Sequence, residues 1–282
     1  MYKLICIDLD GTLLDDGKDV SKENAEIINR VCEQTEVIPV ITTGRPYLCA
    51  EHIGNIVGKN FTNYIIAANG GIIRDNKKGI DIKRENISSE NVRKVMDIAE
   101  KYNFKVIIDT GEEVYDDTGS GGTLYKKIGH PVYHIENLME KLRTEDISGY
   151  NITLTGKIEN LIKATEEFKE MGTVEPTPIC EYKIKTGMET LERTYIDILP
   201  KGVTKKDGII KLAEYLNVKK EEIMVIGDGG NDLPMFDVAG LKVAMQNGLE
   251  IVRNSADYVT IGNNENGVAK AIKKFIFNEE SN

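Results

Sequence analysis

Residues 3–13 read Lys3-Leu-Ile-Cys-Ile-Asp-Leu-Asp-Gly-Thr-Leu13. The apolar, β-branched residues before the first aspartate are typical of a strand that is buried on both faces, and Gly11 then ends it. Because side chains alternate along a strand, Asp8 and Asp10 are expected to point to the same side. The pair would therefore lie at the carboxyl end of a central strand, where open α/β sheets place their ligand sites.

Two neighbouring carboxylates are unfavourable unless a cation or a proton offsets their repulsion. The same Asp-x-Asp-Gly run is also common in turns, and this interpretation stays open for the segment alone. An EF-hand calcium loop is excluded, because that loop requires Glu at its twelfth position. Counted from Asp8, this position is Asp19, and the residues before Asp8 predict a strand.

The composition is that of an ordinary globular protein. The length of 282 residues suggests about two domains or one large one. Hydrophobic residues make up 40% of the chain and charged residues 29%, which leaves ample material for a core. The net charge of −10 argues against non-specific nucleic-acid binding. An anionic substrate is still compatible with this charge, because a local cation can dominate one pocket.

The cysteine pattern and the hydropathy indicate the compartment. The four cysteines contain no C-x-x-C pair, which is typical of a reduced, intracellular protein without disulfides. No apolar run approaches the roughly 18 residues of a membrane span. The N-terminus leads directly into the first predicted strand, without the pattern of a signal peptide. We therefore expect a cytoplasmic protein with no membrane and no nucleic-acid partner, and its oligomeric state is left open.

Strand and helix patterns alternate in the first and last thirds of the chain. The first third predicts a helix at Ser21–Gln34 with Ser21 as N-cap, a second helix after Arg45-Pro46, and strands at Leu4–Leu9, Val37–Thr42 and Tyr64–Ala68. The last third predicts helices at Thr204–Leu216, from about Asp232 and at Gly267–Ile276, and strands at Ile223–Ile226, Val243–Met245 and Tyr258–Ile261. This βαβ pattern predicts an α/β fold with a Rossmann-like parallel sheet.

The middle third interrupts this pattern. It predicts helices at Ser88–Tyr102 and Glu159–Met171, a loop at Thr118–Gly122, and strands at Phe104–Ile108, Tyr150–Thr155 and Thr194–Leu199. We therefore predict a discontinuous core domain, formed by residues 1–83 and 191–282. An inserted α+β cap domain of residues 84–190 would lie above the carboxyl edge of the sheet.

A second polar segment follows the predicted strand at Val37–Thr42. The strand ends in Thr42 and Thr43, and Gly44 follows. A hydroxyl and backbone amides at a strand end can hold phosphate oxygens. Taken alone, however, the segment favours a threonine that caps the next helix.

A third segment contains a lysine in an unusual place. Lys205 stands in the first turn of the helix predicted at Thr204–Leu216, where a cation is electrostatically unfavourable. Its presence there suggests a function such as neutralising carboxylates or phosphate. The alternative is a solvated surface lysine, which fits Lys206 well.

The fourth segment is the acidic, glycine-rich turn after the strand predicted at Ile223–Ile226. Residues 227–232 read Gly-Asp-Gly-Gly-Asn-Asp. Asp228 and Asp232 suit a magnesium site, because magnesium prefers oxygen ligands and often binds one or two carboxylates together with phosphate and water. The alternative for Asp232 is a cap of the following helix.

In this order the segments resemble the four motifs of the haloacid dehalogenase-like hydrolases. The motifs are Asp-Leu-Asp-Gly-Thr at 8–12, Thr-Gly-Arg at 43–45, Lys205, and the turn at 227–232. The chain resembles most closely the Cof-type sugar-phosphate phosphatases, which carry a large α/β cap between the second and third motifs. The inserted module falls in that interval. One departure is Gly230, where Cof-type members commonly have Glu.

The resemblance implies catalytic roles. Asp8 would be the nucleophile that forms an aspartyl phosphate. Asp10 would be the general acid and base, protonating the leaving alcohol and then activating water. Thr43 and Gly44 would bind the transferring phosphoryl group. Lys205 would offset the charge of the phosphate and of the nucleophile. Thr43 is chosen over Thr42 because the family places this hydroxyl directly before Gly-Arg.

The resemblance also implies a magnesium site. Mg²⁺ would bind the side chains of Asp8 and Asp228 and the backbone carbonyl of Asp10. Asp232 would support the ion directly or through water, and Asn231 would orient the catalytic lysine beside the phosphate. Metal and lysine matter because phosphoryl transfer depends mostly on positioning and charge stabilisation.

The expected function is that of a magnesium-dependent phosphatase acting on a small phosphorylated metabolite, with sugar phosphates first. The alternatives are a phosphomutase of the same superfamily and a non-catalytic, phospho-accepting regulatory protein. Asp10 argues against the ATPase relatives, which usually have Thr at that position. The Asn69-Gly70-Gly71 turn also matches a family feature, although a hairpin turn is favoured for it.

Overall fold

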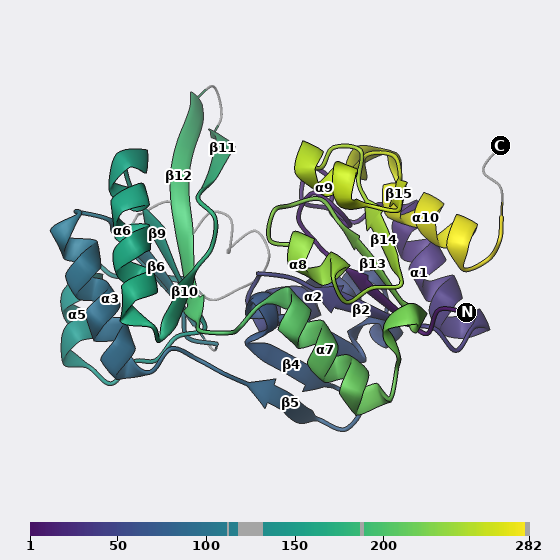
Figure 1. The fold of residues 1–282 in the computed structure, drawn as a ribbon, viewed down its shortest axis with the longest axis horizontal. Helices are drawn as coiled ribbons and strands as arrows, with labels where there is room; N and C mark the ends of the chain where they lie inside the picture. Colours follow the sequence, from purple (N-terminus) through teal and green to yellow (C-terminus); the bar gives the residue numbers. More distant parts are fainter. Residues whose placement is uncertain (112, 118–131, 187–188, 280–282) are drawn as a thin grey trace. The chain divides into compact units, whose positions relative to one another are not determined.

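The chain forms two compact units in the computed structural model, which describes residues 1–111, 113–117, 132–186 and 189–279 (Figure 1). The first unit combines Met1–Arg84 with Thr204–Asn282, and the second is Glu85–Val203. The second boundary thus lies after residue 203, which corrects the predicted boundary after residue 190. The reason is β12 (Glu189–Pro200), which pairs with strands of the second unit.

An eight-stranded sheet in the order β15-β14-β13-β1-β2-β3-β4-β5 forms the centre of the first unit. Its strands are β1 (Leu4–Ile7), β2 (Ile38–Thr42), β3 (Tyr64–Ala67), β4 (Ile72–Asp75), β5 (Ile80–Arg84), β13 (Ile223–Gly227), β14 (Leu241–Ala244) and β15 (Tyr258–Val259). The strands from β15 to β3 are parallel, and β4 and β5 are antiparallel. This confirms the predicted parallel α/β core. Because β2 and β13 flank β1, the strand order reverses at β1, where such sheets bind ligands.

Helices cover the sheet of the first unit. They are α1 (Lys22–Gln34), α2 (Tyr47–Val57), α7 (Lys205–Leu216), α8 (Leu233–Phe236), α9 (Glu250–Ser255) and α10 (Gly267–Phe275), with 3-10 turns η1 (Lys59–Thr62), η2 (Ala68–Gly70), η3 (Lys220–Glu222) and η4 (Asn263–Glu265). Side chains of α7 and α8 share one buried cluster with β1, β2 and β13. Helix α1 contacts α2, α10 and β2. The predicted N-cap is confirmed, since the Ser21 hydroxyl accepts the Asn24 N–H at 3.1 Å.

The second unit is built on a mixed sheet with the order β10-β12-β9-β6-β7-β8, and β11 pairs with β12. Its elements are α3 (Ser89–Lys101), α5 (Leu138–Thr144), α6 (Ile158–Met171), β6 (Lys105–Asp109), β7 (Val114–Asp116), β8 (Val132–His134), β9 (Asn151–Thr155), β10 (Val174–Pro176) and β11 (Cys180–Thr186), with β12 as above. The predicted loop at Thr118–Gly122 lies outside the described residues. Among the described residues, no helix is both long and apolar enough to cross a bilayer.

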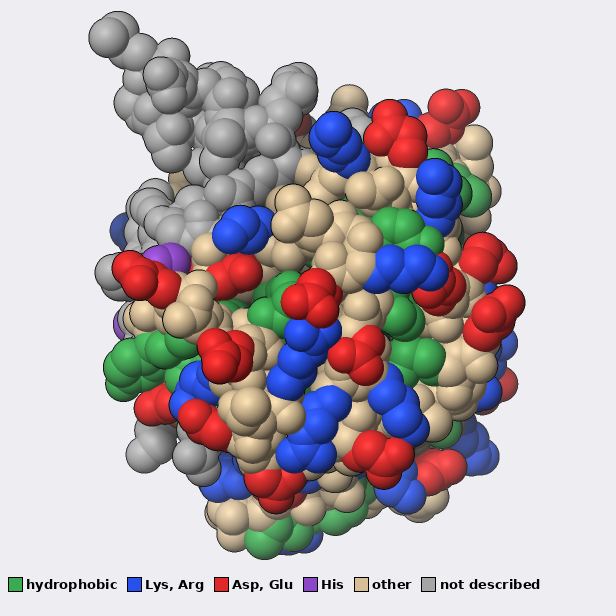
Figure 2. Space-filling view, turned by 90° about the vertical axis from the view of Figure 1, so that its left-hand side faces the viewer, with side chains coloured by type: hydrophobic (Ala, Val, Ile, Leu, Met, Phe, Trp, Pro, Cys, Tyr) green, Lys and Arg blue, Asp and Glu red, His purple; other side chains and the backbone are tan. Residues whose placement is uncertain are grey.

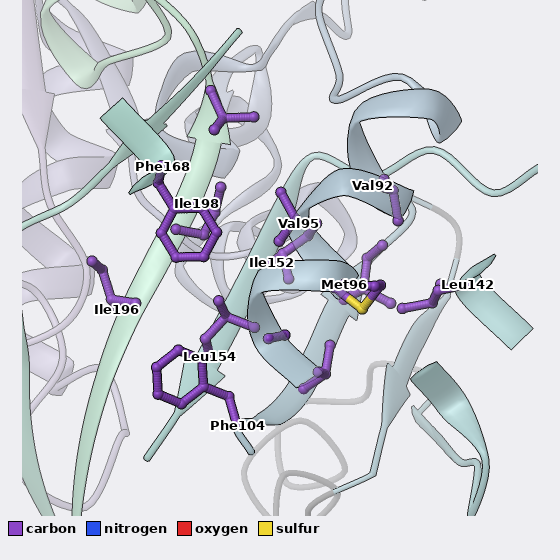
Figure 3. Close-up of a cluster of buried hydrophobic side chains, with 14 of the residues drawn as sticks. Val92, Val95, Met96, Phe104, Leu142, Ile152, Leu154, Phe168, Ile196 and Ile198 are labelled. Carbon is purple, nitrogen blue, oxygen red and sulfur yellow. The ribbon is translucent and has the colours of Figure 1, made fainter. Parts of the chain in front are cut away.

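Alternate residues of β9 and β12 build the core of the second unit (Figure 3). Ile152, Leu154, Ile196 and Ile198 are fully buried, and they pack against apolar side chains of the three helices, among them Val95, Met96, Leu142 and Phe168. Burial follows a period of two on these strands and a helical period on α3 and α6, as side-chain geometry requires of strands and helices that cover one core. Figure 2 views the side where these helices lie, and among the described residues acidic and basic side chains mix there.

Candidate active site

Three neighbouring parallel strands bring their carboxyl ends to one edge of the first sheet. Asp8 follows β1, Thr43 follows β2 and Asp228 follows β13. The Asp8 N–H donates to the Ile226 carbonyl at 3.1 Å, and the Thr43 N–H to Ile66 at 2.9 Å, so neighbouring strands hold each backbone. The parallel order of the strands therefore explains why residues that are far apart in sequence meet here.

Lys205 is buried in this edge, with 1% of its surface exposed. Its ammonium donates to Asp8 Oδ1 at 2.5 Å and to Asp232 Oδ1 at 2.6 Å. Burial by itself lowers the pKa of Lys205, but the attraction of Asp232 and Asp8 outweighs burial and raises it. The structure thus excludes a solvated surface position for Lys205, whereas Lys206 does form a surface ion pair with Asp237.

The start of α7 determines where Lys205 lies. The Thr204 hydroxyl caps this helix by accepting the Asp207 N–H at 3.2 Å. Gly70 has φ of 99°, and a Cβ there would overlap the Thr204 carbonyl oxygen. Only glycine therefore permits this close approach of η2 to the helix end. Since η2 joins the antiparallel strands β3 and β4, the hairpin predicted there is confirmed.

Three carboxylates lie close together at this edge of the sheet, and two of them contact the ammonium. Oxygens of Asp8, Asp228 and Asp232 all lie within 4.8 Å of one another. Burial and then Asp232 raise the pKa of Asp8 well above its usual range, against the opposing effect of Lys205. Burial, followed by Asp232, raises the pKa of Asp228 to about 6. One ammonium among three carboxylates leaves excess negative charge, and an all-oxygen donor set of this kind fits a hard cation such as Mg²⁺.

Both oxygens of Asp232 are already engaged. Oδ1 accepts from Lys205, and Oδ2 accepts the N–H groups of Asp228 and Gly229, each at 2.9 Å. Asp232 occupies the N-cap position of α8, but its side chain makes no capping hydrogen bond. The carboxylate therefore shapes the 227–232 turn and holds the lysine instead of capping the helix.

Asp10 lies in a different environment from Asp8. The strand ends at Ile7, two residues earlier than predicted, so alternation along β1 does not by itself orient Asp10. Its side chain is 41% exposed, and Arg45 binds it through Nε to Oδ2 and Nη2 to Oδ1, both at 2.6 Å. The ammonium of Lys18 donates to Oδ1 at 2.8 Å.

These cations set the charge of Asp10. Burial favours a higher pKa, but the hydrogen bonds and charges of Arg45 and Lys18 outweigh it and hold the pKa of Asp10 below its usual range. Neither cation had a role predicted from the sequence. The contact of Arg45 could have been predicted, because Arg45 belongs to the Thr-Gly-Arg motif and a guanidinium group is suited to binding a carboxylate through two hydrogen bonds. The contact of Lys18 could not, because it depends on how the following turn closes.

The two adjacent threonines differ in position. Thr43 is buried and its hydroxyl accepts the Arg45 N–H at 3.1 Å, in the turn that leaves the strand. Thr42 is the last residue of β2 and lies against the Cys6 thiol inside the sheet. A Cβ at Gly44 would lie 3.1 Å from the Asn69 amide, so Gly44 permits η2 to pack on this turn.

Two further residues complete the comparison with the sequence. Thr12, which received no role from the sequence, donates to Asp228 Oδ1 at 2.7 Å. Asn231 is exposed, and among the described residues no hydrogen bond joins it to Lys205. The expected orienting contact of Asn231 is therefore corrected: the carboxylates of Asp8 and Asp232 orient the lysine.

Comparisons with known proteins place the chain in one family. Residues 5–272 match the family described as haloacid dehalogenase-like hydrolase. Two Bacillus subtilis proteins named 5-amino-6-(5-phospho-D-ribitylamino)uracil phosphatase are similar to this chain. YwtE is 30% identical over 97% of this chain and 98% of its own length, and YcsE is 28% identical over 97% of this chain and 96% of its own length.

Solved structures give the same result. A haloacid dehalogenase-like hydrolase from Bacteroides thetaiotaomicron has a TM-score of 0.79 at 26% identity, covering 97% of this chain and 99% of that chain. TM0651 from Thermotoga maritima has a TM-score of 0.75 at 27% identity, covering 100% and 99%. The chain belongs to the haloacid dehalogenase-like hydrolase family and, as its curated relatives are named, is a phosphoric monoester hydrolase.

Proposed function

We propose that this enzyme is a magnesium-dependent phosphatase that hydrolyses a small phosphorylated metabolite through an aspartyl phosphate on Asp8. The observation that carries the proposal is the buried ammonium of Lys205, held between Asp8 and Asp232 at 2.5 and 2.6 Å. Because apolar residues in place of a buried ion pair often leave a protein equally stable or more stable, stability alone is a weak reason for a buried lysine between two carboxylates. Such a lysine suits a site that must accept a phosphate dianion.

The magnesium ion would be held by the side chains of Asp8 and Asp228 and the backbone carbonyl of Asp10. Asp232 would act beside it, because its oxygens already serve Lys205 and two backbone amides. When bound, Mg²⁺ supplies positive charge that stabilises the phosphoryl oxygens. The raised pKa values of Asp8 and Asp228 support this proposal, since they reflect carboxylates that lack sufficient positive charge.

The reaction would proceed in two steps. An Asp8 oxygen attacks phosphorus, the bond from phosphorus to the ester oxygen breaks, and the leaving alkoxide takes a proton from Asp10. Water then attacks the aspartyl phosphate and gives its proton to Asp10, and phosphate leaves as the acyl phosphate bond breaks. Lys205 offsets the charge on the phosphoryl group, and the Thr43 hydroxyl and the Gly44 backbone bind its oxygens.

Asp10 needs a proton for the first step and a free carboxylate for the second. The ion pairs with Arg45 and Lys18 favour the carboxylate. A phosphate dianion that binds nearby would offset these two cations and so favour proton uptake. In this proposal, substrate binding therefore prepares Asp10 to act as an acid.

The family and the named relatives support a substrate class. A sugar phosphate or a sugar-alcohol phosphate leads, because the relatives YwtE and YcsE are named for a phosphoribityl compound. The unit at Glu85–Val203 would act as the inserted cap and supply the residues that select the leaving group. A cytoplasmic location stays a prediction.

The experiment is phosphate release from a panel of phosphometabolites, with Mg²⁺ or with a chelator. The panel includes hexose phosphates, pyridoxal phosphate, flavin mononucleotide and 5-amino-6-(5-phospho-D-ribitylamino)uracil. We expect magnesium-dependent release that falls by about 10³-fold or more in Asp8→Asn. If Asp8→Asn releases phosphate as fast as wild type, and a contaminating phosphatase is excluded, Asp8 is not the nucleophile.

The phosphomutase alternative has its own test. A mutase retains the phosphoryl group, so bisphosphorylated sugar should stimulate isomer formation without net phosphate release. A phospho-accepting regulator would instead hold its aspartyl phosphate for hours, whereas a phosphatase would lose it within seconds. Membership of a hydrolase family favours the phosphatase.

A further inference from the structure

The turn that follows the first aspartates presents Lys18 to Asp10. Leu14 and Val20 form an antiparallel bridge, and the Asp15 N–H donates to the Asp19 carbonyl at 3.0 Å. Within this hairpin the Lys18 N–H donates to the Asp15 carbonyl, also at 3.0 Å. Lys18 thus lies at the tip of a closed turn and not on a loose loop.

The backbone at this tip disfavours a lysine. Lys18 has φ of 69°, in the left-handed region that glycine and asparagine tolerate best. Among the described residues, the other non-glycine positions with positive φ are asparagines, apart from Ala68. Backbone conformation does not explain a lysine at this position, so we look for the explanation in the contacts of its side chain.

Hydrogen bonds join this turn to η4, which is distant in sequence. The Asp16 N–H donates to Asn264 Oδ1 at 3.0 Å, and the Asp16 carboxylate accepts from Asn263 and Asn264 at 3.2 and 3.0 Å. Asn263 also donates to the Leu14 carbonyl at 3.0 Å. Because η4 anchors the turn at both of these points, the turn can place the lysine at a defined position.

The ion pair contributes little to stability. The side chains of Lys18 and Asp10 are 33% and 41% exposed, and ion pairs at such exposure contribute little. Arg45 already neutralises Asp10 through two hydrogen bonds. The contact of Lys18 with Oδ1 therefore affects the orientation of Asp10 more than its charge. Arg45, after the end of β2, and Lys18, in the turn, together restrict the rotation of this carboxylate.

We propose that Lys18 is a positioning residue, which holds the Asp10 carboxylate at the angle needed for proton transfer to the leaving group. This inference rests on the proposed function, in which Asp10 is the general acid and base. Its effect should depend on how much the leaving group needs a proton. An alkoxide needs protonation to leave, whereas a nitrophenolate leaves without it.

The experiment compares p-nitrophenyl phosphate with an alkyl phosphate, glycerol 3-phosphate, in wild type, Lys18→Gly and Lys18→Arg. We expect Lys18→Gly to lower kcat on the alkyl phosphate about tenfold and on the aryl phosphate less than about threefold, with little change in KM. Lys18→Arg should recover much of the loss. The melting temperature of Lys18→Gly should be equal to or higher than that of wild type, because glycine suits the turn.

The matched control is Lys242→Met. Lys242 pairs with Asp257, and these side chains are 34% and 44% exposed, almost as in the Lys18 pair. This variant should leave the ratio of the two rates unchanged. A double-mutant cycle completes the design: Lys18→Gly should cost little further activity on the alkyl phosphate once Asp10 is Asn, since Lys18 acts through Asp10.

Two results would overturn the assignment while leaving the phosphatase intact. The first is equal loss on both substrates with a raised KM, which would mean that Lys18 binds the substrate directly. The second is unchanged rates in Lys18→Gly. If wild type releases phosphate from neither substrate nor from the panel above, the proposed function fails, and the role of Lys18 fails with it.

Discussion

Lys205 is the residue on which the site depends most. Its ammonium is the counter-charge that the described residues provide to Asp8 and Asp232, and it is fully enclosed. The sequence indicated its importance through one electrostatic anomaly, a cation in the first turn of a helix. Its two partners lie 197 and 27 residues away, so no local pattern could identify them.

Lys205→Met should destabilise the metal-free protein by about 3 kcal/mol near neutral pH, because two buried carboxylates lose their cation. The loss should be smaller at acidic pH, where these carboxylates take up protons instead. Urea unfolding in the presence of a chelator measures both values. Lys206→Met, which removes a surface ion pair, is the control and should change the free energy of unfolding by less than about 1 kcal/mol. A destabilisation that does not vary with pH would contradict this account.

The adjacent threonines offer a second test at this scale. Thr43→Val should lower kcat/KM by about 10²-fold, since it removes a hydroxyl proposed to bind the phosphoryl group. Thr42→Val should leave kcat/KM within a few-fold of wild type, because Thr42 lies inside the sheet beside Cys6. Steady-state kinetics on the best substrate of the panel decides. Equal losses in both variants would mean that the choice between these residues is wrong.

At the scale of elements, the helix signals of the sequence are confirmed to within a residue or two. Helix α1 begins after Ser21, the predicted N-cap, and α7 begins one residue after the predicted start at Thr204, which the structure shows to be its N-cap. Short elements such as β5, β8 and α5 were not predicted. Their few residues carry little periodicity. Pairing with β4 and β7 stabilises β5 and β8, and packing of Leu138 and Leu142 in the core stabilises α5, more than their own propensity does.

Helix capping separates stability from activity. Thr204→Ala and Ser21→Ala each remove a hydroxyl that accepts a backbone N–H, so each should cost about 1 kcal/mol of stability. Only Thr204→Ala should also lower kcat, by several-fold, because it loosens the turn that carries Lys205. Chemical unfolding and steady-state kinetics on the two variants measure these effects. If Ser21→Ala loses as much activity as Thr204→Ala, the effect is one of general stability and not of lysine placement.

At the scale of the whole molecule, proton and metal should compete for the site. The pKa of Asp228 is raised to about 6, so its carboxyl group is protonated below this pH and ionised above it. Magnesium binds the ionised form, so its Kd should rise at least about tenfold for each pH unit below about 6, and more steeply where Asp8, the other proposed side-chain ligand, is protonated as well. Titration calorimetry at several pH values measures the slope. A Kd that is independent of pH would contradict the assignment of Asp228 as a ligand.

The same shift predicts how stability varies with pH. A raised folded-state pKa means that the unfolded chain loses its proton first as pH rises, so the metal-free protein loses stability up to about pH 6 and does not regain it above. Added Mg²⁺ should therefore raise the melting temperature more at about pH 8 than at about pH 5. Asp228→Asn, which cannot ionise, is the control and should show a smaller difference, because only Asp8 of the two proposed side-chain ligands still takes up a proton.

By itself, the sequence determined the fold class, the order of the core elements and most of the reactive groups. Buried parallel strands and amphipathic helices leave strong periodic signals, and strand ends in a parallel sheet collect on one edge, so Asp8, Thr43 and Asp228 could be placed together. The four ordered motifs then indicated the family, which the comparisons confirm.

Only the tertiary structure decided the charge arrangement around these groups. It showed that Lys205 donates to Asp8 and Asp232 and not to Asn231. It also showed that Arg45 and Lys18 bind the Asp10 carboxylate, and that β12 belongs to the second unit. The physical reason is the same in each case. Ion pairs and strand pairing join residues that are distant along the chain, and their geometry depends on turns whose closure no local periodicity records.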